Sequence, residues 1–334
     1  MLLFEKYRPK QFQDSKLNLD ILNKVETISN VDSFHNLFIY GGMGCGKYTL
    51  ALMILNKIFG KEVYNKTQKK FEYTIGNSHK TIDITCSKYH YEIYFNDNYD
   101  YDYNIICEFL KDVSRTLNVI TNSFKVIVLR NIQFINKNMY NVIKNICEKS
   151  YNQCKFIFMC NSISNIPRLM FGFFFFIRVS MIHQKEELYE YINKICIKEK
   201  ITMNPEKLNK LIRKYKYNLN MIFATLQLIK QNKNYNMVDP LELRYKKIIG
   251  LIKKNDITKV NDIRKELYDL TSCNINKYEL IMYLYEYFME KSSIVKKEEL
   301  TRITNSIFIS MGNSYRDLFH LEYFVMNLLN YTTR

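Results

Sequence analysis

A short apolar strand, a glycine-rich loop and a helix follow one another near the start of this sequence, and this unit constrains the fold more than any other feature. Residues 37–50 read LFIYGGMGCGKYTL and contain the pattern G-x-x-x-x-G-K. Backbone N–H groups of such a loop wrap phosphates, the helix N-terminus adds a positive dipole, and the lysine reaches the β- and γ-phosphates. We therefore predict a nucleotide site that includes Gly41, Gly42, Gly44, Cys45, Gly46 and Lys47.

The position after the lysine departs from this pattern. A serine or threonine that ligates Mg²⁺ normally follows the lysine, but Tyr48 stands there and Thr49 comes one residue later. One residue rotates a side chain by about 100° around a helix, so Thr49 points in another direction. The sequence predicts ATP or ADP at a site that includes Tyr48 and Thr49, with or without Mg²⁺, and we assign no metal ligand.

The order of the elements divides the 334-residue chain into an α/β part and a helical part. Apolar, β-rich runs alternate with helical patterns as far as residue 179, which is typical of a parallel sheet. Strand signals then stop and amphipathic helical patterns follow. We predict a nucleotide-binding domain at residues 1–180, a helical lid at 181–236 and an all-α domain at 237–334. The expected strands are 37–40, 81–86, 125–129, 155–160 and 173–179.

Charge and composition narrow the classes of partner. The formal net charge of +16 favours a polyanion such as nucleic acid, although solubility and a lysine-rich codon bias would give the same value. The eight cysteines have no CxxC or metal-ligand spacing, which indicates a reducing compartment. The longest apolar stretch, 169–177, is far shorter than the roughly 20 residues that span a bilayer, so we expect no membrane partner.

Several further segments resemble the small subunits of replication factor C, the sliding-clamp loader of the AAA+ superfamily. They are EKYRP at 5–9, SKYHYEI at 87–93, FKVIVL at 124–129, CNSISNIP at 160–167 and FHLEYFV at 319–325. The phosphate loop is most similar to that of the variant eukaryotic small subunit whose loop contains Gly-Lys-Lys-Thr. The resemblance implies an α/β AAA+ P-loop domain with a parallel sheet, a helical lid and an all-α C-terminal collar domain.

The same resemblance implies partners and two kinds of binding residue. Family members form a hetero-pentamer with other replication factor C subunits and load the sliding clamp onto primer–template DNA, in the nucleus or another DNA-replicating compartment. The segment that matches Tyr7, Arg8 and Pro9 lies against the adenine in the family, and Asn161 matches a polar residue called sensor 1. In the family, DNA is tracked by residues at the N-termini of helices that follow Walker B. The matching helix here follows FKVIVL at 124–129, which implies contacts from Lys137 and Lys144.

Residues that the family uses for hydrolysis are replaced in this chain. Arg130 and Asn131 stand where hydrolysing relatives have Asp-Glu, the pair that holds the Mg²⁺ shell and activates water. Gly172 occupies the place of the arginine finger, for which Arg168 or Arg178 could substitute from a shifted position, and Asn220 aligns with the lid arginine that senses phosphate. We therefore assign no catalytic residue and predict little or no ATPase activity of this chain.

Two other functions stay open beside a non-catalytic or weakly catalytic clamp-loader subunit. The first is an active DNA-stimulated AAA+ ATPase, which turnover by the isolated chain would favour. The second is a pure scaffold that has lost nucleotide binding, which Tyr48 and Arg130 favour and Gly46 and Lys47 oppose. His90, which lies among aromatic residues, is interpreted as a hydrogen-bonded core residue.

Overall fold

The computed structural model describes residues 2–29, 34–75, 78–95, 103–116, 124–135, 137–150, 152–164, 166–181, 185–232, 240–254, 260–273, 277–291, 294–312 and 317–333. The chain forms two units, Met1–Tyr235 and Asn236–Arg334. Each unit has its own hydrophobic core, and the two are described separately.

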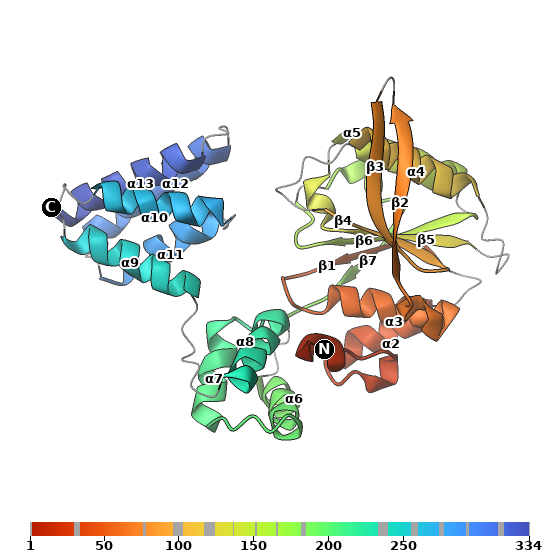
Figure 1. Cartoon of the computed structure of the whole chain (residues 1–334), viewed down its shortest axis with the longest axis horizontal. Coiled ribbons are helices and arrows are strands. Elements are labelled where there is room, and N and C mark those ends of the chain that lie inside the picture. The colour runs from red at the N-terminus through yellow and green to blue at the C-terminus, as the bar shows by residue number, and fades with distance from the viewer. Residues whose placement is uncertain are drawn as a thin grey trace. The chain divides into compact units, whose positions relative to one another are not determined.

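A seven-stranded sheet in the order β2-β3-β4-β5-β6-β1-β7 forms the centre of the first unit (Figure 1). Strands β4, β5, β6, β1 and β7 pair in parallel, and β2 and β3 extend the sheet on one side in antiparallel pairing. This mostly parallel sheet agrees with the predicted α/β class. The bounds are β1 Leu37–Tyr40, β2 Thr67–Ile75, β3 Ser78–Cys86, β4 His90–Tyr94, β5 Lys125–Arg130, β6 Cys154–Cys160 and β7 Phe175–Arg178.

Helices cover both faces of this sheet, as Figure 1 shows, and successive strand residues serve the two faces in turn. Helices α2 (Leu19–Ile28) and α3 (Lys47–Phe59) pack on the face that receives Leu37 and Ile39 of β1. Helices α4 (Tyr103–Arg115) and α5 (Lys137–Lys149) pack on the face that receives Phe38. The central strands are therefore buried on both sides, which explains their continuous apolar sequences.

Four more α-helices lie in the described part of the first unit: α1 (Leu3–Lys6), α6 (Lys185–Lys198), α7 (Pro205–Lys214) and α8 (Leu219–Gln231). Helix α7 begins with a proline at its first position, where the missing N–H needs no partner. The side chain of Asn218 caps α8 by accepting from the N–H groups of Asn220 and Met221. The cap fixes the start of α8, which lies against the phosphate loop. Short 3₁₀ turns lie at Phe12–Asp14, Lys61–Tyr64, Ile132–Phe134 and Arg168–Met170.

The described residues of the second unit form five helices: α9 (Pro240–Lys254), α10 (Val260–Ser272), α11 (Lys277–Lys291), α12 (Ile294–Gly312) and α13 (Asp317–Thr333). Their core contains Ile248, Leu267, Leu284 and Phe324. Large apolar side chains also lie exposed on this unit, among them Leu243, Tyr268, Ile309, Phe319 and Tyr323. Every helix in the described ranges is too short or too polar to cross a membrane.

Candidate nucleotide-binding site

The parallel pairing of the sheet brings the predicted residues to one edge. Tyr40, the last residue of β1, pairs with Cys160 of β6, and Arg130 at the end of β5 pairs with Met159. The glycine-rich loop begins directly after Tyr40, and Asn161 directly after Cys160. Ligands of open α/β sheets bind at this edge, outside the carboxyl ends of the strands.

The phosphate loop requires glycine where other parts of the unit approach it. A Cβ atom on Gly44, whose φ is +74°, would lie 1.9 Å from Oδ1 of Asn218 at the start of α8. A Cβ atom on Gly41 would lie 2.1 Å from the carbonyl oxygen of Val179, after β7. Both distances are far below van der Waals contact, so the loop is fitted between β7 and the helical segment that begins at Asn218.

Lys47 and Asn161 contact each other beside the glycine-rich loop. The Lys47 Nζ donates to the Oδ1 of Asn161 at 3.0 Å and to the carbonyl oxygens of Gly41 and Gly42, each at 2.7 Å. Burial lowers the pKa of Lys47. The ammonium group is thus held by three oxygens at the N-terminus of α3.

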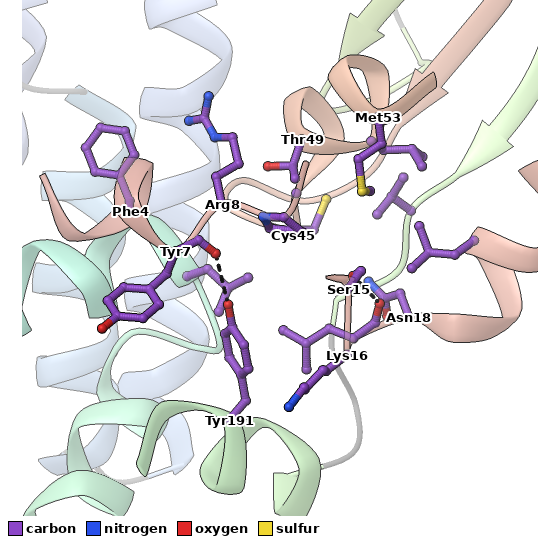
Figure 2. A pocket seen from close by; sticks show the side chains of 18 of the residues that line it. Phe4, Tyr7, Arg8, Ser15, Lys16, Asn18, Cys45, Thr49, Met53 and Tyr191 are labelled. Atoms are coloured by element: carbon purple, nitrogen blue, oxygen red, sulfur yellow. Dashed lines mark hydrogen bonds between the residues drawn. The ribbon is translucent and has the colours of Figure 1, made fainter. Parts of the chain in front are cut away.

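A cavity lies between the N-terminal segment, the phosphate loop and the helices α6 and α8 (Figure 2). Tyr7, Arg8 and Pro9 line it from one side, and Figure 2 shows Cys45 and Thr49 facing it from the loop and from α3. Further lining comes from the helical segment and from the loop before α2: Tyr191, Leu219, Asn220, Phe223, Asp14, Lys16 and Asn18. Aromatic and aliphatic walls beside a phosphate loop suit a nucleoside.

Glu199, just after α6, ties the N-terminal segment to the helices that line this cavity. Its carboxylate accepts from Lys6 at 2.6 Å, from the hydroxyl of Tyr7 at 2.5 Å and from Lys230 of α8 at 2.6 Å. These three hydrogen bonds lower the pKa of Glu199 to about 2, and burial together with Glu199 raises the pKa of Tyr7 to about 12. We call these four residues the latch.

The latch is supported by two bonds to the backbone of the N-terminal segment. The N–H of Leu3 donates to Oε1 of Gln227 in α8 at 2.9 Å, and the hydroxyl of Tyr191 donates to the carbonyl oxygen of Tyr7 at 3.3 Å (Figure 2). The Tyr7 ring is therefore turned toward the latch, while its backbone and the neighbouring Arg8 remain at the cavity.

Tyr48 begins a second polar cluster, on the side of the loop where Mg²⁺ would bind in hydrolysing relatives. Its hydroxyl donates to Glu92 Oε2 at 2.9 Å and contacts the Lys66 ammonium. Lys66 donates to Glu92 Oε1 at 2.7 Å, and Nε2 of His90 lies 2.9 Å from the same oxygen. His90 is fully buried and its Nδ1 lies 2.6 Å from the hydroxyl of Ser87, which confirms its interpretation as a core residue.

Burial and charge act in opposite directions on Glu92. Burial would raise its pKa, but the hydrogen bond with His90 and the charge of Lys66 outweigh burial and lower the pKa to about 2. Burial, followed by the charge and hydrogen bond of Glu92, raises the pKa of Tyr48. Burial lowers the pKa of Lys66 against the opposing effect of Glu92. We take Glu92 and Lys66 as a charged pair, because each supplies the other's counter-charge at 2.7 Å.

Two arginines lie over the Tyr48 ring. The Cζ atom of Arg130 is 4.0 Å from the ring centroid and that of Arg8 is 5.0 Å from it. Arg130 also lies 4.9 Å from the ring of Tyr94. Guanidinium groups are favoured on aromatic faces.

These residues do not fit Mg²⁺. The ion prefers oxygen ligands and keeps several waters. Here the hydroxyl of Tyr48 is engaged by Glu92 and Lys66, and Glu92 is held by Lys66 and His90. Arg130 adds a positive charge 4.0 Å from the Tyr48 ring, where a cation would meet repulsion.

The other residues that replace the family's hydrolysis residues lie at the following places in the structure. Asn131 has a left-handed φ of 57° and donates its amide to the carbonyl oxygen of Phe95 at 3.3 Å. Asn220 lines the cavity. Gly172 is exposed in the turn before β7, and Arg168 and Arg178 are exposed on either side of it.

The two predicted DNA contacts lie on α5. Lys137 is the first residue of this helix, but its side chain falls outside the described residues. Lys144 is partly exposed and its ammonium lies 3.7 Å from the carboxylate of Glu148, one turn further along. Lys144 is therefore partly neutralised by its own helix.

Sequence reasoning missed the residues that complete both polar clusters. Lys66, Glu92, Glu199 and Tyr191 come from segments without a recognised nucleotide motif. His90 and Glu92 are two residues apart on β4 and so point to the same face, which was the available signal. This signal could be used only if residues 90–94 were known to form a strand, and the sequence analysis did not predict strand β4.

Curated proteins with similar sequences point to one family, although no protein-family model matches the chain. The chain is 24% identical to a replication factor C small subunit of Acanthamoeba polyphaga mimivirus, over 98% of this chain and 90% of that protein. It is 25% identical to replication factor C subunit 5 of Schizosaccharomyces pombe, over 97% and 95%. It is 22% identical to replication factor C subunit 3 of Arabidopsis thaliana, over 99% of this chain and 97% of that protein. This chain is thus related to the replication factor C small subunits along nearly its whole length.

Proposed function

We propose that this chain is a subunit of a replication factor C-type clamp loader that binds ATP or ADP and does not hydrolyse it. The absence of hydrolysis is inferred from Arg130. This residue ends β5, and its guanidinium lies 4.0 Å from the centroid of the Tyr48 ring. A catalytic acid would have to act from this position, and an arginine can neither coordinate a cation nor accept a proton from water. Loss of a general base costs roughly 10²–10⁴-fold in rate.

Nucleotide binding is supported by the features that remain. Lys47 and Asn161 lie together at the phosphate loop, and a cavity with aromatic and aliphatic walls opens beside it. Tyr7 and Pro9, on either side of Arg8, line that cavity, as the family resemblance implies for the segment beside the adenine. The variant subunit with a Gly-Lys-Lys-Thr loop is the family member whose place in the complex we propose for this chain.

The partners that follow are the other replication factor C subunits, the sliding clamp and primer–template DNA, where DNA is replicated. DNA contact is proposed at the start of α5, through Lys137 and Lys144, because a helix N-terminus and a lysine both favour phosphate. Lys137→Ala in the assembled complex should reduce the salt dependence of DNA binding by about one counterion. An unchanged salt slope would remove Lys137 from the DNA surface.

Substitution of the phosphate-loop lysine in an assembled complex tests the nucleotide site. Lys47→Ala should leave the steady-state ATP turnover of the complex little changed, because the site contributes no hydrolysis. The same variant should lose nucleotide that co-purifies with the wild-type chain. The corresponding lysine of a hydrolysing subunit is the positive control. A large fall in turnover with Lys47→Ala would contradict a silent site.

A pure scaffold without nucleotide is the second candidate, favoured by the Tyr48–Glu92–Lys66 cluster on the metal side of the loop. Nucleotide released on denaturing the purified wild-type chain distinguishes the two, since a scaffold would release none. An active DNA-stimulated ATPase is the third candidate, and turnover by the isolated chain in the presence of DNA would establish it.

A further inference from the structure

The metal side of the phosphate loop carries a surplus of positive charge. Arg8, Arg130 and Lys66 all lie within 5.0 Å of the Tyr48 ring centroid, and Lys47 precedes Tyr48 in the chain. Glu92 balances Lys66. The surplus that remains comes from Arg8, Arg130 and Lys47.

In the described part of the chain, the two arginines have no acidic counter-charge within ion-pair distance. Within the described ranges, no carboxylate lies within 4.0 Å of the guanidinium of Arg8 or of Arg130. Arg8 lines the cavity together with Gly46 and Thr49, so its charge is at the same opening as the phosphate loop. Asp14 and Lys16 also line the cavity and carry opposite charges. Two unpaired guanidinium groups beside a phosphate loop form a site for an anion rather than for a cation.

This arrangement changes the form of nucleotide that fits. In a site with a serine or threonine and an acid, Mg²⁺ neutralises the phosphates. In this chain a Mg²⁺ ion carried by the nucleotide would approach Arg130 and Arg8, which repel it. Without the ion, the same phosphates meet fixed guanidinium donors, which make strong charge-assisted hydrogen bonds with phosphate oxygens.

We propose, on the basis of the nucleotide binding proposed above, that the ligand of this site is the metal-free nucleotide. Arg130 and Arg8 take the place of the magnesium ion, and Mg²⁺ therefore opposes binding. The site is thus a reversal of the usual one, since in a hydrolysing subunit magnesium supports the nucleotide and here it competes with the protein for the phosphates.

The first experiment measures binding of a fluorescent ADP analogue to the full chain, at constant ionic strength, in EDTA and in saturating Mg²⁺. We expect an apparent Kd about tenfold higher or more in Mg²⁺, which corresponds to the loss of one charge-assisted hydrogen bond. Thermal shift with unlabelled ADP and ATP gives a second measurement, because a ligand that binds the folded state raises Tm. The rise in Tm should be larger in EDTA.

The second experiment changes the arginines. Arg130→Ala and Arg8→Ala should each raise the Kd in EDTA by about tenfold and reduce the difference between EDTA and Mg²⁺. Arg115→Ala, at the exposed end of α4, is the matched control and should have no effect. The double variant with Tyr48→Thr and Arg130→Asp should bind the ADP analogue more tightly in Mg²⁺ than in EDTA.

The outcomes separate the two proposals. Tighter binding in Mg²⁺ than in EDTA would overturn the proposal that the ligand is the metal-free nucleotide, but it would still support nucleotide binding at this site. Equal binding in both, with Arg130→Ala and Arg8→Ala unchanged, would overturn it as well. Binding in neither condition would instead refute the proposed nucleotide binding itself.

Discussion

The side chain of Glu92 is 6% exposed and contacts Tyr48, Lys66 and His90. Its negative charge is the counterpart of a lysine that is itself largely buried. In such a pair the charge of each partner is tolerated in the interior because of the other, so removal of one partner leaves an uncompensated ion. The charge at residue 92 is therefore expected to matter more for stability than a surface carboxylate does.

Glu92→Gln should lower the free energy of unfolding by about 3 kcal/mol, because Lys66 would remain buried without its counter-charge. Urea unfolding followed by circular dichroism measures the change. Glu62→Gln is the control, since Glu62 and its partner Lys88 are both at least half exposed and their pair should contribute nothing measurable. Equal effects of the two substitutions would show that Glu92 acts as a surface residue.

The pH dependence of this contribution has a defined sign. The pKa of Glu92 is lowered from 4.5 to about 2, so the unfolded chain binds the proton more readily than the folded one. The stabilising contribution is therefore complete above about pH 4.5 and is lost as the pH falls toward 2. Glu92→Gln should flatten the stability profile in this window compared with the wild-type chain.

Residues of the phosphate loop could be predicted from the sequence because their pattern is local. Lys47 and its three oxygen partners include Asn161, which the family resemblance supplied. Glu92 and Lys66 could not be predicted in this way, because they lie 44 and 18 residues from Tyr48 in the chain. Their contact depends on the pairing of strands, which is a property of the folded sheet.

Among the elements, the α-helices that line the cavity are connected to the N-terminal segment by the latch. Glu199→Gln should weaken the bonds to Lys6, Tyr7 and Lys230 and raise amide exchange at residues 2–9 and in α8. Hydrogen exchange measured by mass spectrometry checks this. Glu190→Gln is the control, because Glu190 lies on α6 but pairs only with exposed Lys194 among the described residues. Unchanged exchange in Glu199→Gln would mean that apolar contacts alone hold the segment.

The stabilising contribution of the latch is expected to be lost at both low and high pH. Its carboxylate has a pKa lowered to about 2, so this contribution is complete above about pH 4.5 and is lost as the pH falls toward 2. The Tyr7 hydroxyl has a pKa raised to about 12, so its contribution is complete below about pH 10 and is lost as the pH rises through 12. The protection of amides at residues 2–9, measured against their intrinsic exchange rate at each pH, should therefore fall at both extremes.

Strong apolar patterns made most elements predictable, and polar strands escaped prediction. The central strands β1, β5 and β6 lie close to their expected bounds. Strand β2 reads TQKKFEYTI, in which most residues are polar, and it gains its strand conformation from nine residue pairs with β3. Pairing rather than intrinsic preference forms such a strand.

For the whole molecule, the second unit carries many of the large exposed apolar side chains and the first unit carries the candidate site. Deletion of residues 236–334 should therefore abolish co-purification with other replication factor C subunits but preserve nucleotide binding. The physical reason is that exposed apolar surface favours association, while all cavity residues belong to the first unit. Pull-down from a co-expressed complex and ADP binding by the truncated chain measure the two effects. Normal assembly of the truncated chain would locate the subunit contacts in the first unit.

The stacking of Arg130 on Tyr48 also couples the two positions that would have to change in a design for a metal-dependent site. Neither single substitution is expected to create such a site. Arg130→Asp alone would leave Tyr48 in the position after Lys47, and Tyr48→Thr alone would leave Arg130 at the end of β5 and remove the hydroxyl that Glu92 accepts from. Both intermediates lose contacts before either gains a function, and a double-mutant cycle should reveal this as coupling between the two positions.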